Sequence, residues 1–86
     1  MLSKREREFI KLVLESEFWG DLIDKIRENW GYEERIALSS TDYRIEGYIR
    51  RLIHTIRKKY EIAKEEIKLI EEFFDKLEYL GYMLRR

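Results

Sequence analysis

Apolar residues recur at helical spacing through most of the chain. In its first third, two amphipathic stretches each place their apolar residues on one helical face. Ser3 and Glu6 match the capping box that starts a helix, and Gly31 is placed to be the left-handed residue that follows the end of one. We therefore expect helices over residues 3–18 and 21–30.

A longer apolar stripe occupies the C-terminal half. Its positions alternate spacings of four and three residues without interruption, which gives four heptads. The stripe consists of Ile49, Ile53, Ile56, Tyr60, Ala63, Ile67, Ile70, Phe74 and Leu77. Further apolar residues flank it and make the face wider than a two-stranded coiled coil needs. This width favours a bundle of three or four helices.

Residues 42–80 form either one long helix or a helical hairpin. The middle of this region contains no Gly or Pro, and residues 58–61 carry no turn chemistry. We favour the long helix, preceded by an irregular connection over residues 32–41 with a short helical turn at 33–38. A break near residues 58–61 is the alternative. Either way, 86 residues are expected to form a single all-α domain.

The two halves of this C-terminal region carry opposite charge, although the whole chain is neutral with 18 basic and 18 acidic residues. Residues 44–59 contain six basic residues and one acidic residue, whereas residues 61–78 contain seven acidic and three basic residues. Antiparallel packing would set the basic half against the acidic half, and parallel packing would set like against like. We therefore expect an antiparallel homodimer. Its candidate interface is Ile49, Ile53, Ile56, Tyr60, Ile67, Ile70, Phe74 and Leu77.

Basic residues cluster opposite the apolar stripe in residues 43–60. Guanidinium groups one helical turn apart can contact phosphates, and such contacts supply most non-specific affinity for nucleic acid. The candidate nucleic-acid-binding residues are Arg44, Arg50, Arg51, His54, Arg57, Lys58 and Lys59. The competing interpretation is a solvated helix face that balances the acidic half. The leading function is a nucleic-acid-associated regulator or accessory factor. The alternative is a protein–protein adaptor or structural module that acts through helix-mediated oligomerisation.

Residues that could support catalysis or hold a cofactor are scarce. The chain has no Cys, a single histidine (His54) and no glycine-rich phosphate loop. These absences exclude cysteine-ligated metals and argue against a Ser-His-Asp relay. We expect no enzyme activity, no cofactor and no metal site. Residues 1–11 are charged, and no apolar run approaches the roughly 18 residues that span a bilayer. We therefore expect a soluble cytoplasmic protein with no membrane partner.

Composition and two sequence phrases point to a source. Eleven Ile against one Val, a single Asn, no Gln and 42% charged residues are typical of hyperthermophiles. The phrase REREFI at residues 5–10 and the run YIRRLIHTIRKKYEIAKEEIKLIEEFF at residues 48–74 resemble small uncharacterised helical proteins of archaea. The resemblance covers about half of the residues. It implies an archaeal helical protein without known catalysis and transfers no site residues.

Overall fold

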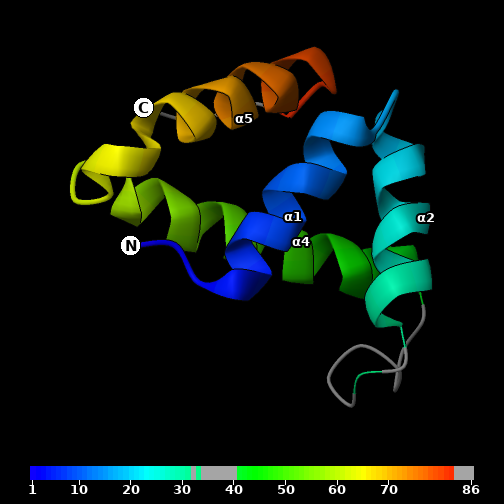
Figure 1. The fold of residues 1–86 in the computed structure, drawn as a ribbon. Helices are drawn as coiled ribbons and strands as arrows, with labels where there is room; N and C mark the ends of the chain where they lie inside the picture. Colours follow the sequence, from blue (N-terminus) through cyan, green and yellow to red (C-terminus); the bar gives the residue numbers. More distant parts are fainter. Residues whose placement is uncertain (32, 34–40, 83–86) are drawn as a thin grey trace.

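The computed structural model describes residues 1–31, 33 and 41–82, and every regular element in this part of the chain is helical. The elements are α1 (Lys4–Glu15), α2 (Trp19–Trp30), α4 (Asp42–Lys59), the 3-10 turn η1 (Lys64–Glu66) and α5 (Ile67–Tyr79) (Figure 1). The expected all-α fold is thus confirmed. Apart from Glu33, the helical turn expected at residues 33–38 lies outside the described residues.

The ends of the first two helices follow local chemistry. Ser3 Oγ accepts a hydrogen bond from the Glu6 backbone amide at 3.1 Å, and Glu6 Oε1 accepts one from the Ser3 amide at 2.7 Å. The predicted capping box is therefore present. Gly31 follows α2 but has a right-handed φ of −63°, so the left-handed expectation there is wrong. A Cβ at Gly31 would lie 2.3 Å from the carbonyl oxygen of Arg27, which is why glycine suits the position.

The favoured continuous helix over residues 42–80 is wrong, and the alternative break is what the structure has. Helix α4 ends at Lys59, whose carbonyl accepts hydrogen bonds from the amides of Ile62 at 3.1 Å and Ala63 at 2.9 Å. Ala63 then leaves the helical region of the backbone, with φ −91° and ψ 59°. This turn reverses the chain direction without Gly or Pro.

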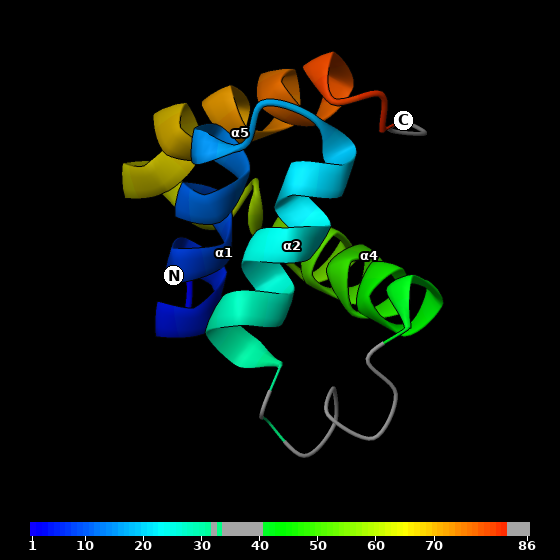
Figure 2. The ribbon, with the colours of Figure 1, turned by 90° about the vertical axis from the view of Figure 1, so that its right-hand side faces the viewer.

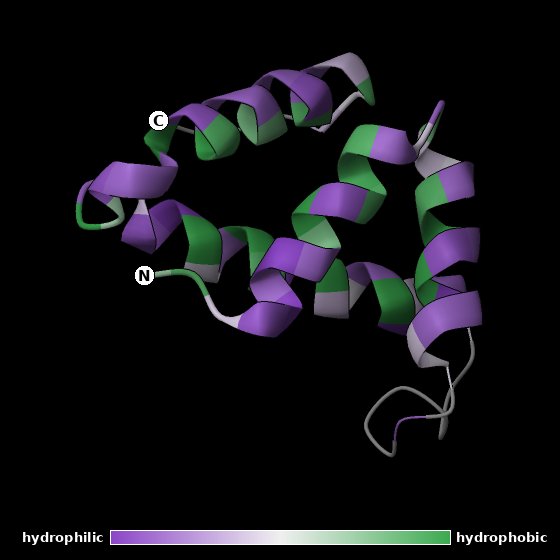
Figure 3. Cartoon of the chain, in the orientation of Figure 1, coloured by the Kyte–Doolittle hydropathy of each residue, from purple (hydrophilic) through white to green (hydrophobic). Residues whose placement is uncertain are grey.

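Helix α1 packs against α5, α2 and α4, and α2 packs against α4 (Figures 1 and 2). The rings of Phe9 in α1 and Phe73 in α5 meet edge to face with centroids 5.7 Å apart. In α5, the apolar residues lie on the side that faces α1 (Figure 3). The break after α4 allows both α4 and α5 to turn their apolar faces toward α1.

The apolar stripe is divided between these two helices. Ile49, Ile56, Ile70 and Leu77 are fully buried inside the single chain, and Ile53 is 2% exposed. These five side chains were expected at an interface between two copies, but here they form the core of one copy. The physical reason is that α1 and α2 supply the apolar partner surface that a second long helix would otherwise provide. The remaining candidate interface residues, Tyr60, Ile67 and Phe74, are partly buried.

Candidate functional site

The outer face of α4 gathers most of the predicted nucleic-acid-binding residues. At about 100° per residue, its buried isoleucines occupy one side of the helix and the basic residues occupy the opposite side. We call this outer face the basic surface, and define it as Arg44, Arg50, Arg51, His54, Arg57 and Lys58. All are exposed except Arg57, which is partly buried. From Arg44 to Lys58, the surface extends about 21 Å along the helix axis.

Most cations of the basic surface have no ionic partner in the described part of the chain. Arg50 lies 3.7 Å from Glu46, a loose pair one turn away on the same helix. No salt bridge or side-chain hydrogen bond to a described residue involves the charged groups of Arg44, Arg51, Arg57 or Lys58. Exposed cations that are not neutralised within a protein retain their full capacity to bind anions.

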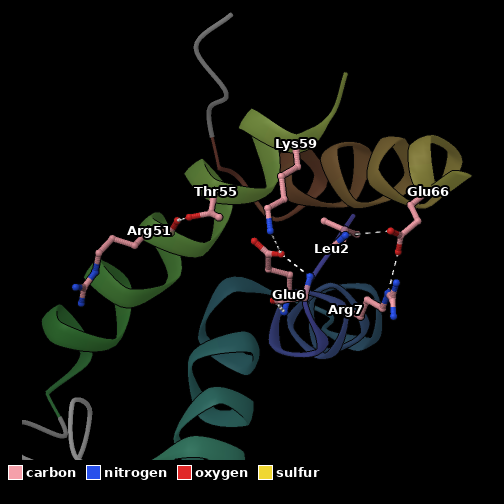
Figure 4. A network of polar contacts seen from close by, with 8 residues as sticks. Leu2, Glu6, Arg7, Arg51, Thr55, Lys59 and Glu66 are labelled. Carbon is pink, nitrogen blue, oxygen red and sulfur yellow. Dashed lines mark hydrogen bonds and ion pairs between the residues drawn. The ribbon is translucent and has the colours of Figure 1, made fainter. Parts of the chain in front are cut away.

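Lys59, the seventh predicted residue, belongs to a different cluster. Its Nζ donates to Glu6 Oε1 at 2.8 Å, so its charge is used inside the fold (Figure 4). The side chain of Arg51, by contrast, points away from this cluster (Figure 4). Six of the seven predicted residues therefore share the basic surface, and Lys59 is excluded from it.

The cluster around Lys59 fastens the N-terminus to the turn between α4 and α5. Glu66 accepts hydrogen bonds from the Leu2 amide at 3.1 Å and from Arg7 Nε at 2.9 Å (Figure 4). Glu6, which is only 3% exposed, accepts from both Lys59 and Ser3. Both carboxylates thus connect α1 to residues about 60 positions away in the sequence. We call Leu2, Glu6, Arg7, Lys59 and Glu66 the N-terminal clasp.

The carboxyl groups of the clasp have perturbed pKa values. Burial by itself raises the pKa of Glu6, but the hydrogen bonds from Lys59 and Ser3 together outweigh burial and hold the pKa below its usual range. The pKa of Glu66 is also lowered, chiefly by the hydrogen bond from Arg7 and then by the one from the Leu2 amide. Both groups are therefore ionised at neutral pH, which fits a structural role.

The acidic half of the region does not neutralise the basic half. Among the described residues, no salt bridge joins a cation of α4 to α5. An open cleft of about 880 Å³ separates Arg57 and Lys58 on one wall from Glu71 and Asp75 on the other. Within the described residues, the opposite charges of the two halves are therefore not paired by side-chain contacts inside one chain.

Gly47 lies in the middle of the basic surface, although it is not among the residues predicted from the sequence. A Cβ built on this glycine would meet nothing within 4 Å. Its neighbours one turn before and after are Tyr43, Arg44, Arg50 and Arg51. The sequence alone would have placed Gly47 on this surface, because a helical projection of α4 puts it on the side opposite the buried isoleucines.

Comparisons with known proteins give no relative from which the role of the basic surface could be inferred. No protein-family model, no curated protein and no solved structure matches the chain. The described residues hold no group of three or more His, Cys, Asp or Glu side chains that could bind a metal ion. None of the described helices is long and apolar enough to cross a membrane.

Proposed function

We propose that this protein is a non-enzymatic, cytoplasmic accessory factor or regulator that binds nucleic acid through the basic surface of α4. The observation that carries the proposal is the set of four cations, Arg44, Arg51, Arg57 and Lys58, that lack a partner in the described part of the chain. They line one face of a rigid helix whose opposite face is the protein core. If the cations served only to keep the helix soluble, pairing them with nearby carboxylates would stabilise the helix further, as the pair of Lys25 with Asp21 does in α2.

The neutrality of the whole chain is consistent with this function. Acidic residues lie in α5, and the cleft holds them apart from the cations of α4. Since salt screens charges over about 8–10 Å, a polyanion approaching α4 encounters mainly the local positive charge. The acidic α5 repels the same polyanion and so favours one orientation of binding.

The test is a salt titration of affinity for duplex DNA, read by fluorescence anisotropy. Log affinity falls with log salt at a slope of about −0.9 per phosphate contact, so each contact that is lost makes the slope less negative by about 0.9. The triple variant Arg44→Ala, Arg51→Ala, Lys58→Ala is therefore expected to make the slope less negative by about 3. The matched control is Lys4→Ala, Lys11→Ala, Lys68→Ala, which removes the same charge from exposed positions in α1 and α5. No binding at low salt, or equal slopes for the two triple variants, would refute the proposal.

A second candidate function is self-association as an adaptor, and the cleft between α4 and α5 favours it. One wall is cationic, the other is anionic, and the partly buried rings of Tyr60 and Phe74 lie between them. A second copy related by a two-fold axis would set each cationic wall against an anionic one. Sedimentation equilibrium tests this second function, because finding only monomer at tens of micromolar would exclude self-association as the role of the protein. Glu71→Lys with Asp75→Lys is expected to abolish such a dimer and to strengthen nucleic-acid binding, because it removes acidic charge that repels the polyanion.

A further inference from the structure

The basic surface has an internal order that a uniformly charged face lacks. Arg44, Arg51 and Lys58 follow one another at seven-residue steps and form one row along α4. Arg50 and Arg57 form a second row, which the helical periodicity places about 120° around the helix from the first. Between the two rows lies a strip without permanent charge that contains Tyr43, Gly47 and His54.

Gly47 lies in the middle of this strip. Glycine is the second-worst residue for a helix interior, after proline, so alanine would favour α4 more. No packing explains the glycine, because a Cβ there would meet nothing within 4 Å. Such a position exposes bare backbone at the outermost line of the helix, and lets another molecule approach the helix axis more closely than any side chain would allow.

Two rows of cations on either side of a strip that lacks permanent charge match the shape of a groove with phosphates on both rims. The major groove of B-form DNA is about 12 Å wide and admits an α-helix, whose diameter with side chains is about 10–12 Å. We propose that α4 lies lengthwise in the major groove of duplex DNA. The strip of Tyr43, Gly47 and His54 faces the base pairs, with the helix backbone coming closest to them at Gly47, and the two arginine-containing rows lie on opposite phosphate backbones. This inference rests on the function proposed above and specifies its ligand and docking geometry.

The same geometry argues against duplex RNA as the ligand. The major groove of A-form RNA is deep and too narrow for protein elements to enter. Only one of the two rows could then contact phosphates, and the strip around Gly47 would not face the base pairs at the floor of the groove. The two duplexes carry the same number of phosphate charges, so a difference in affinity between them reports on duplex geometry rather than on the number of charges.

The experiment compares binding of DNA and RNA duplexes of one sequence, about 20 base pairs long, to the full chain and to two variants. Gly47→Leu fills the central strip and favours helix, so α4 remains folded. Asn29→Leu is the matched control, because it adds the same side chain at an exposed position of α2 without changing charge. Circular dichroism melts accompany each variant to confirm the fold.

The expected result is that the parent chain binds DNA at least tenfold more tightly than RNA. Gly47→Leu is expected to lose at least tenfold in DNA affinity with an unchanged or higher thermal midpoint, while Asn29→Leu binds as the parent does. Equal affinity for the two duplexes, or unchanged DNA affinity of Gly47→Leu, would each overturn the groove geometry and leave phosphate binding by the basic surface standing. No binding of either duplex at low salt would overturn both.

Discussion

Lys59 and Lys58 are adjacent in the sequence, yet the structure gives them opposite roles. Lys59 neutralises the nearly buried carboxylate of Glu6, with Nζ 2.8 Å from Oε1. Lys58 is exposed on the basic surface and has no ion-pair partner in the described part of the chain. Replacing each by methionine removes one charge and keeps the apolar stem. The pair of variants therefore separates the structural cation from the cation that we propose binds nucleic acid.

The cost of Lys59→Met can be estimated from the geometry of the clasp. A hydrogen bond to a charged group contributes about 1.5–3 kcal/mol, and breaking a fully buried ion pair costs about 3–5 kcal/mol. The Lys59 side chain is 29% exposed, so water can take part of its place, and Glu6 keeps the hydrogen bond from the Ser3 amide. We expect the free energy of unfolding to fall by about 2 kcal/mol. For a domain of this size, that lowers the thermal midpoint by about 8–16 °C.

The assay is urea unfolding at pH 7, monitored by circular dichroism. Lys58→Met is the control. Lys58→Met is expected to stay within about 0.5 kcal/mol of the parent, as surface substitutions do. DNA affinity should show the reverse order of sensitivity. It falls for Lys58→Met and stays constant for Lys59→Met under conditions where both variants are folded. If the two variants had equal stability, the assignment of Lys59 to the clasp would be refuted.

The pH dependence of the same variants checks the role of Glu6. Because the folded-state pKa of Glu6 is lowered, its ionised form stabilises the fold at pH values above the unfolded pKa of about 4.3. That stabilisation is lost as the pH falls through the folded pKa. The difference in unfolding free energy between the parent and Lys59→Met should therefore be largest near pH 7 and shrink below about pH 4. A difference that is constant from pH 7 to pH 3 would contradict this account.

Four further substitutions test the fold, each by urea unfolding. Phe73→Ala removes a fully buried ring that contacts α1 and should lower the free energy of unfolding by about 3–5 kcal/mol, whereas a loss below about 1 kcal/mol would contradict the packing of α1 on α5. Ser3→Ala removes the capping hydroxyl and should cost about 1 kcal/mol, and no loss would mean that the cap contributes nothing. Gly81→Ala should lower the free energy of unfolding by about 1 kcal/mol, because φ is +92° there. Gly47→Ala should raise it by about 1 kcal/mol, because alanine favours a helix interior more than glycine and its Cβ would meet nothing within 4 Å. Changes of the same sign at the two positions would contradict these backbone assignments.

Local sequence patterns were sufficient to predict that the chain is helical and where its first helix begins. The capping box at Ser3 and Glu6 starts α1 as expected, and the periodicity of apolar residues identifies the buried face of each helix. These features depend on contacts within one or two helical turns, so the sequence alone contains them. The same periodicity placed six of the seven predicted nucleic-acid-binding residues on one exposed face of α4.

The break after Lys59 could not be predicted in this way. Residues 60–63 contain no Gly or Pro, and the turn is held by groups that are distant in the sequence. Glu66, just after the turn, accepts hydrogen bonds from Leu2 and Arg7, and Lys59, just before it, donates to Glu6. A continuous helix would leave its wide apolar face exposed along part of its length. The break costs a few helical hydrogen bonds and allows both halves of that face to pack on α1.

The sequence by itself thus determined the helical class of the chain, the amphipathic face of each helix and the separation of basic from acidic residues, because each depends on neighbours along the chain. The tertiary structure alone decided how those elements are used. It placed the apolar stripe in the core of one chain, assigned Lys59 to a buried carboxylate and left the other cations of α4 facing solvent. The physical reason is that burial and ion pairing depend on which surfaces meet in space, and α1 determines this by packing against both α4 and α5.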